Sequence, residues 1–426
     1  MTPTMTRQTF LGVKAPHGAD TMPSIRFATT SLFFAAALSA QSLTGSWDCT
    51  VTVNGNVIPF RMEFSGNGPA VSGNFFNGEE RVPSTSGQLQ EGSLRLHFDQ
   101  YASRLEATVK EDALEGRYGR DARWYPFRAH RAPAASASAA SAFGDVPDID
   151  GLWEIPTRSS KGESAWRFIV RQKGVEVSAA ILRVDGDTGA LTGAWRDGKF
   201  VLSHFSGARP NLLEITPAAG GTLSIVQNGR TTLTALRPAS ARAQGLGEPT
   251  DPFHHTGVKD ASVPFTFAFP DLDGRTVSLS DARFRGKVVV VAISGSWCPN
   301  CHDEAPFLEE LYRQYRAQGL EVVALSFEEA DQLNTLTRLR AFIKQYGIDY
   351  TVLVAGEPGQ LVEKLPQAEN LNSWPTTFFL GRDGRVRGVH AGFAGRASGE
   401  FYTRTRREVT DLVERLLAES TGAAAR

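Results

Sequence analysis

The amino-acid sequence predicts two duplicated antiparallel all-β domains followed by an α/β domain. A length of 426 residues suits roughly two to four domains. One stretch of the chain matches another at a constant offset, and after residue 255 short alternating strands give way to strands that alternate with helices. The expected parts are a leader at 1–40, β-rich repeats at 41–132 and 147–238, linkers at 133–146 and 239–255, and the α/β domain at 256–426.

The composition is that of an ordinary globular protein, with 41% hydrophobic and 21% charged residues. Because 45 basic and 46 acidic side chains leave a formal net charge of −1, the overall charge gives no support for a nucleic-acid partner. Three cysteines are too few for a scaffold held together by disulfides. These counts leave a multidomain globular protein without nucleic acid as the expectation.

The first 40 residues are expected to be a secretory leader. An apolar run from Ser31 to Ala40 follows Arg26 and ends in small residues, which is the pattern of a signal peptide cleaved after Ala40. The run is too short for a membrane span of about 20 residues, so no stable span is expected after cleavage. A buried apolar stretch is the alternative, and Met22 is an alternative start. Export to the periplasm or beyond would allow a cysteine pair to be held oxidised.

The two β-rich repeats are recognised by their alignment at an offset of 106 residues. Gly45 and Trp47 fall on Gly151 and Trp153, and the match continues without a gap. Internal duplication accounts for this. Alternating apolar runs separated by Gly, Asn and Asp turns predict antiparallel strands in both copies. Each copy could form a small barrel or sandwich, or both could close one larger sheet, and the residues leave this open.

Within the repeats no His, Cys or carboxylate cluster has the spacing of a ligand set. Cys49 lies in a predicted strand and is expected to be a small buried side chain, with a resolving or intermolecular thiol as the alternative. The tryptophans of the predicted strands are expected in the core rather than around a ligand cavity. They are Trp47, Trp153, Trp166 and Trp195.

Strands and helices are expected to alternate around a parallel core after residue 256. The unbroken β-branched run at 288–293 is typical of a central strand covered on both faces. Apolar residues at helical spacing follow it and end at Gly319. The other predicted elements are a hairpin at 266–279, strands at 320–326, 351–354 and 376–380, a strand ending at 390, and helices at 336–346 and around 409–417.

The run Trp297-Cys298-Pro299-Asn300-Cys301 joins the central strand to the next helix. Cys298 precedes the first turn, where unpaired N–H groups and the helix dipole lower a thiol pKa, so it is the expected nucleophile. Cys301, one turn further on, can attack a mixed disulfide and is the expected resolving thiol. Glu304 shares that helical face and is expected to carry the resolving thiol's proton, with a simple interaction with the helix dipole as the alternative.

These motifs, with Glu304 to Pro306 and Pro375 to Phe378, resemble the TlpA/ResA-type thioredoxin-like oxidoreductases over about residues 255–420. The resemblance implies a thioredoxin-like fold, an exported thiol-disulfide oxidoreductase that favours reduction, and a cis peptide bond before Pro375 facing the cysteines. Cytosolic thioredoxins carry a buried Asp where this chain has Ala292. The family pattern has a glutamate at the position of Glu304.

The sequence therefore predicts a site for disulfide exchange. Its expected catalytic residues are Cys298, Cys301, Glu304 and Pro375, and its expected substrate groove is formed by Trp297, Pro299, Trp374 and Thr376. The backbone of the loop at 374–375 is expected to pair with an extended peptide. The expected partners are disulfide-bearing envelope proteins and an upstream thiol electron donor. Neither a cofactor nor a metal is expected.

Other chemistries for the cysteine pair fit less well. Zinc needs four ligands, and the chain has no second CxxC and no HxxxH. A copper site of the Sco kind would draw on His390, but Sco proteins place three residues rather than two between their cysteines. A purely structural disulfide is less expected, because the ring that a Cys298–Cys301 disulfide closes is small and strained. A peroxiredoxin would have Thr where this chain has Gly295.

A second hypothesis concerns the β repeats. Together they are longer than the α/β domain but contain no group of catalytic residues. In this hypothesis the β repeats recognise a ligand or partner, and the redox domain is an accessory. His254, His255 and His302 are expected to be solvated or loop side chains.

Overall fold

The computed structural model describes residues 42–66, 70–133 and 146–419. The expected leader, its cleavage site and most of the first linker lie outside the described residues. Across the ranges it does describe, no helix combines the length and the apolar character that crossing a bilayer requires.

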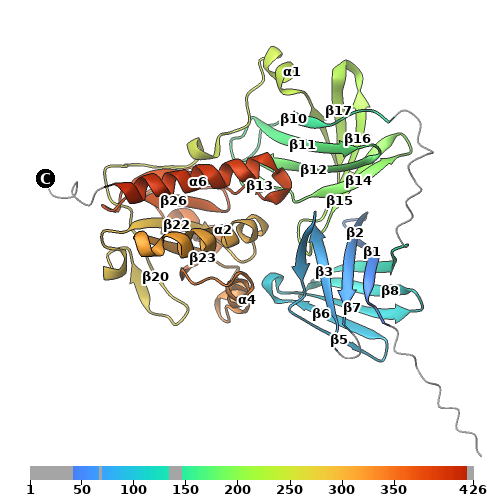
Figure 1. Cartoon of the computed structure of the whole chain (residues 1–426), viewed down its shortest axis with the longest axis horizontal. Coiled ribbons are helices and arrows are strands. Elements are labelled where there is room, and N and C mark those ends of the chain that lie inside the picture. The colour runs from blue at the N-terminus through green and yellow to red at the C-terminus, as the bar shows by residue number, and fades with distance from the viewer. Residues whose placement is uncertain (1–41, 67–69, 134–145, 420–426) are drawn as a thin grey trace, which may run out of the picture. The chain divides into compact units, whose positions relative to one another are not determined.

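The first β region is a nine-stranded antiparallel sheet in the order β4-β3-β2-β1-β9-β8-β7-β6-β5 (Figure 1). Its first strand therefore pairs with its last, with Cys49 opposite Ala129. Alternate side chains form a core on one face, as the period of two predicts. The strands are β1 (Gly45–Val53), β2 (Asn56–Ser65), β3 (Ser72–Asn77), β4 (Glu80–Pro83), β5 (Ser86–Gln90), β6 (Ser93–Phe98), β7 (Ser103–Lys110), β8 (Ala113–Arg120) and β9 (Arg123–Arg131).

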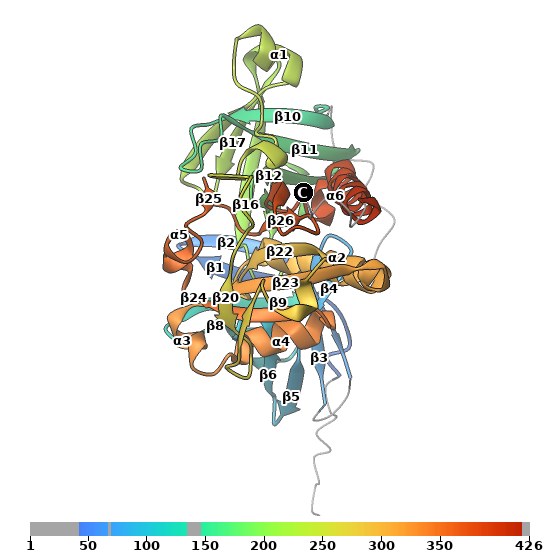
Figure 2. The same ribbon diagram turned by 90° about the vertical axis from the view of Figure 1, so that its left-hand side faces the viewer.

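The second β region is a separate sheet, in the order β10-β11-β12-β14-β15-β16-β17-β18 with β13 paired to β12. Figure 2 shows β10, β11 and β12 side by side. A bridge between Glu154 and Leu236 joins its two ends. Because the two regions form separate sheets, one larger sheet closed by both copies is excluded. The strands are β10 (Gly151–Pro156), β11 (Ala165–Lys173), β12 (Glu176–Arg183), β13 (Gly186–Asp187), β14 (Leu191–Arg196), β15 (Lys199–His204), β16 (Asn211–Ala218), β17 (Thr222–Gln227) and β18 (Thr231–Ala235).

Equivalent contacts recur in the two regions. Trp47 and Trp153 each donate the indole N–H to a backbone carbonyl four residues earlier, at 2.8 Å in both. Arg131 lies over the ring of Trp47 at 4.9 Å, and Arg237 over that of Trp153 at 3.7 Å. Both tryptophans and Cys49 are buried. The two copies therefore share side-chain packing as well as sequence.

The C-terminal domain is built on a mixed five-stranded sheet in the order β24-β23-β22-β26-β27. Its first three strands are parallel, but β26 pairs antiparallel with β22, and β27 pairs antiparallel with β26, so the core is not purely parallel as expected. This is the thioredoxin-like fold. The sheet strands are β22 (Val288–Ser294), β23 (Leu320–Phe327), β24 (Thr351–Gly356), β26 (Thr376–Leu380) and β27 (Val386–Ala391), and outside it lie β19 (Gly257–Val258), β20 (Ala268–Pro270), β21 (Thr276–Ser278) and β25 (Ala368–Glu369).

Strand β22 is buried at every position, which explains its mostly β-branched sequence. Val290 and Ala292 face a core formed with α2, α4 and α6, whereas Val291 and Ile293 face a core formed with β20, β21 and α5. The ion pair between Glu310 and Arg406 places α2 beside α6, as Figure 1 shows. The helices are α2 (Pro299–Tyr315), α3 (Ala330–Leu333), α4 (Thr337–Tyr346), α5 (Leu361–Lys364) and α6 (Glu400–Ala418).

The segment expected to be the second linker contains regular structure and contacts with its neighbours. Residues Pro238–Ala243 form the short helix α1, with a proline in its first turn. Arg242 bonds to Glu154, and Ser164 donates its hydroxyl to the Glu248 carbonyl at 2.9 Å. These contacts tie the segment to the second β region.

Candidate active site

The cysteine pair lies at the turn from β22 into α2. Cys298 is the residue before the helix, and its Sγ accepts a hydrogen bond from the Cys301 backbone N–H at 3.2 Å. Cys298 is 3% exposed and Cys301 is 1% exposed. The positive end of the helix dipole and one of the unpaired N–H groups of the first turn both face a sulfur at this position.

A buried charge network holds the turn that leads to the cysteines. The Ser296 backbone N–H donates to the Glu328 carboxylate at 2.9 Å, and the Ser296 hydroxyl donates to the same carboxylate at 2.5 Å. Arg338 forms a salt bridge to Glu328 at 3.1 Å, and neither side chain is exposed. Both charges therefore have partners, which a buried ion pair requires.

Glu304 lies one turn beyond Cys301 and is 4% exposed. Its carboxyl oxygen accepts a hydrogen bond from the Thr377 hydroxyl at 2.7 Å. Burial raises the pKa of Glu304 to about 8, although the bond from Thr377 acts in the opposite direction. Burial also raises the pKa of the Cys301 thiol, with further contributions from Cys298 and the Glu304 charge. The Cys301 and Glu304 charges thus interact, as their shared helical face predicts.

The loop before β26 carries the cis peptide bond between Trp374 and Pro375. Thr376 pairs with Ile293 at the end of β22, so Pro375 lies at the sheet end from which the cysteine turn departs. The Trp374 ring packs edge-on against that of Trp297 at 5.2 Å. The side chains of Trp297, Pro299 and Trp374 are half-buried, so part of each is accessible from solvent.

Thr376 does not fit the substrate-binding role expected from the sequence. Its side chain has no exposed area, and its hydroxyl donates to the Ser373 carbonyl at 2.8 Å. Because the strand pairing turns Thr376 into the core, its side chain is unavailable to a substrate.

The second β region contacts the start of α2. Arg209 donates to the Asp303 carboxylate at 2.8 Å, to the Asn300 side chain at 3.0 Å and to the Pro299 carbonyl at 3.3 Å. Asn300 in turn donates to the Asp185 carbonyl at 2.8 Å. Asp303, the residue before Glu304, is thus an ion-pair partner across two domains.

His302 is not the solvated side chain that the sequence suggested. It is 4% exposed, and its ring nitrogens lie 2.9 Å from the Ser296 carbonyl and 2.9 Å from the Tyr346 hydroxyl. The ring of Tyr101, from the first β region, packs on it at 4.8 Å. His255 is also buried, with Nε2 at 2.7 Å from Asn372.

A pocket of about 250 Å³ lies beside Trp297 and Pro299. The two β regions supply most of its wall, including Tyr101, Tyr118 and Arg209. The part of the protein next to the cysteine turn is therefore built from three segments far apart in the chain.

Sequence reasoning missed Arg209, Glu328 and Arg338. Arg209 lies about ninety positions before its partners, and no local pattern marks it. Glu328 offers a weak signal, because it directly follows a fully buried strand end. Within the described ranges, no group of three or more His, Cys, Asp or Glu side chains is arranged to hold a metal ion.

Residues 260–389 match the AhpC/TSA family. The chain is 32% identical over 120 residues to "Thiol-disulfide oxidoreductase ResA" of Bacillus thuringiensis, which covers 28% of this chain and 62% of that protein. It is 30% identical over 137 residues to the ResA protein of Geobacillus thermodenitrificans, covering 32% of this chain and 72% of that protein. The chain therefore spans 62% of the length of the first curated relatives it matches.

Among solved structures, a thiol:disulfide interchange protein of the thioredoxin family from Chlorobium tepidum is 23% identical. The match covers 37% of this chain and 97% of that chain, with a TM-score of 0.30. A DsbF homologue from Corynebacterium diphtheriae is 19% identical, with coverage of 40% and 99% and a TM-score of 0.30.

Proposed function

Because the chain belongs, through its C-terminal domain, to the family of ResA thiol-disulfide oxidoreductases, we propose that it exchanges disulfides with protein substrates through Cys298 and Cys301. The observation that carries the proposal is the position of Cys298 before α2, where its Sγ accepts the Cys301 N–H. The positive end of the helix dipole and this N–H donor face the sulfur that would attack the substrate.

In the first step the Cys298 thiolate attacks a substrate disulfide. A bond forms between Cys298 Sγ and one substrate sulfur, and the substrate S–S bond breaks, releasing the second substrate sulfur as a thiolate. The Trp297 and Trp374 rings, which pack against each other beside the turn, form the surface for the substrate. The cis-Pro375 loop presents its backbone to an extended peptide.

In the second step the Cys301 thiolate attacks Cys298 Sγ. The bond between Cys298 and the substrate breaks, and a Cys298–Cys301 disulfide forms. The substrate leaves reduced, as a dithiol, and the protein is oxidised by two electrons. Cys301 must first lose its proton, which burial opposes. Glu304 takes up that proton when it is ionised, and its raised pKa lets it return the proton near neutral pH. An upstream thiol donor then reduces the disulfide.

We further propose that the protein is exported and reduces disulfides of envelope proteins. The signal-like sequence ending at Ala40 supports export. A ResA-type pair kept reduced by an electron donor favours reduction over oxidation, because the direction of exchange follows the two reduction potentials.

A role for the β regions in substrate selection is the second candidate function. Arg209, Asn300 and Asp303 connect the second β region to the cysteine turn, and Tyr101 connects the first region to His302. Because these contacts surround the turn, we propose that the β regions limit which substrates reach Cys298.

Trapping a mixed disulfide tests the proposed exchange. In Cys301→Ser the attacking sulfur remains but the resolving sulfur is lost, so substrates should stay covalently attached to Cys298. The measurement is non-reducing electrophoresis of the native envelope fraction followed by mass spectrometry of the adducts, with Cys298→Ser as the matched control. Adducts with Cys298→Ser and none with Cys301→Ser would reverse the assigned roles.

A further inference from the structure

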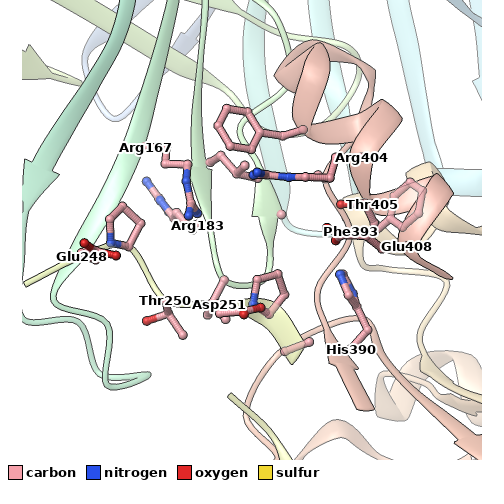
Figure 3. A pocket seen from close by; sticks show the side chains of 18 residues that line it. Arg167, Arg183, Glu248, Thr250, Asp251, His390, Phe393, Arg404, Thr405 and Glu408 are labelled. Carbon is pink, nitrogen blue, oxygen red and sulfur yellow. The ribbon is translucent and has the colours of Figure 1, made fainter. Parts of the chain in front are cut away.

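A second cavity, of about 280 Å³, lies apart from the thiol site, and none of the residues proposed for thiol exchange lines it (Figure 3). Its walls come from β11 and β12 of the second β region, from residues 248–252, and from β27 and α6 of the C-terminal domain. We propose that it binds a small oxyanion with two or more negative charges.

Three arginines provide the positive charge. Arg167, Arg183 and Arg404 line the cavity, and Figure 3 shows Arg404 reaching from α6 toward the other two. In the part of the chain that the structure describes, none of the three guanidinium groups takes part in a salt bridge. They rest instead on aromatic rings: Arg167 and Arg404 lie 5.2 Å and 4.7 Å from the Phe401 ring.

Arg167 and Arg404 carry like charges, which repel each other when no anion lies between them. Burial lowers the pKa of Arg167, and the nearby charge of Arg404 lowers it further. An anion between these groups would replace their repulsion by attraction. Guanidinium groups also match the geometry of phosphate and carboxylate oxygens, with two N–H donors per acceptor group.

Unpaired buried polar atoms point to the same ligand. Arg183 Nε and His390 Nε2 are buried without a hydrogen-bond partner in the described part of the protein, and His390 is only 3% exposed. The other His390 nitrogen, Nδ1, lies 2.9 Å from the Gly392 carbonyl and so carries the ring hydrogen. Nε2 is therefore an acceptor, which a hydroxyl group on the bound oxyanion would satisfy.

Three carboxylates also line the cavity, but two of them have partners of their own. Glu248 pairs with Arg242 at 3.6 Å. Asp251 accepts hydrogen bonds from the Phe253 backbone at 2.9 Å and from His254 at 2.8 Å. Glu408 lies on the exposed side of α6. The arginine charges therefore exceed the unpaired acidic charge at the cavity.

The test measures pyrophosphate and citrate binding to the full chain by calorimetry, at constant ionic strength maintained with sodium chloride. The wild-type protein should bind one molecule and melt at a higher temperature in its presence. Arg167→Gln and Arg404→Glu should each weaken the affinity about tenfold or more, because each removes a charged donor. Arg158→Gln is the control, since Arg158 is an exposed arginine of the same β region outside the cavity.

Folding and function are separated from binding by two further readouts. Arg404 is exposed on α6, so Arg404→Glu should keep the wild-type melting temperature without ligand. Disulfide exchange by both cavity variants should match the wild type, because neither residue belongs to the thiol site. The proposal is overturned if neither anion binds at millimolar concentration, or if Arg404→Glu and Arg167→Gln bind as tightly as Arg158→Gln.

Discussion

Glu304 is the residue whose protonation the fold controls most directly. A carboxyl group on an exposed helix would titrate near 4.5, but burial beneath β26 raises the pKa of Glu304 to about 8. The Thr377 hydroxyl is the only hydrogen-bond donor to this carboxyl among the described side chains. The group is therefore mostly protonated at neutral pH and ionises as the solution becomes mildly alkaline.

Replacing Glu304 with Gln should slow disulfide exchange and flatten its pH dependence. The wild-type rate of the Cys301 step should rise through about pH 8, because the ionised Glu304 accepts the thiol proton. Stopped-flow measurement of the release of a mixed disulfide from Cys298 at pH 6 to 9 gives this profile. An unchanged profile in Glu304→Gln would leave the residue with no more than an interaction with the helix dipole.

The same group should make stability depend on pH. Between its usual pKa of 4.5 and its folded pKa of about 8, the native state holds the Glu304 proton more tightly than the unfolded state does. The free energy of unfolding should therefore fall as the pH rises through this interval, by about 1.4 kcal/mol for each unit of pKa difference. Urea unfolding at pH 5 and pH 9 measures the fall, and it should be smaller in Glu304→Gln. An equal fall in both proteins would contradict this assignment.

At the level of elements, the turn between β22 and α2 depends on the buried pair Glu328 and Arg338. Arg338→Met should destabilise the protein by about 3–5 kcal/mol, because it leaves the Glu328 carboxylate buried without its cation. Adding Glu328→Gln should recover part of the loss, since the uncompensated charge is then removed. Chemical denaturation of both variants checks this. Equal stability of the single and double variants would contradict the proposed role of the charge.

The contact between the loop before β16 and α2 rests on Arg209. Its side chain pairs with Asp303 at 2.8 Å and lies 3.8 Å from Asp187, and all three side chains are largely buried. Arg209→Gln should cost about 3–5 kcal/mol, because two carboxylates lose their cation. Arg209→Lys should cost less, since it keeps the charge but not the forked geometry. Denaturation curves for both variants, with Arg158→Gln as the control, test this order.

At the scale of the whole molecule, the two β regions surround a thiol site that they do not supply. Tyr101 packs on His302, and Arg209 binds Pro299 and Asn300. An isolated fragment of residues 255–426 loses these contacts, so it should reduce insulin at least as fast as the full chain. Circular dichroism establishes whether the fragment is folded. A folded fragment with much slower insulin reduction would mean that the β regions take part in the exchange itself.

The sequence was sufficient for the features that depend on local pattern. Strand β22 was predicted from its β-branched run, and the duplicated β regions from residues that align at a constant offset. The cis bond before Pro375 followed from the family resemblance. The antiparallel pairing of β26 with β22 was missed, because side-chain periodicity does not encode strand direction.

The chain by itself determined which sulfur precedes a helix, since Cys298 and Pro299 lie between a buried strand and an apolar helical pattern. Only the tertiary structure decided what surrounds that sulfur. Thr376 was turned into the core by strand pairing, and His302 was buried beneath Tyr101. The physical reason is that burial and charge pairing depend on which distant segments meet, and Arg209 lies far from Asp303 along the chain.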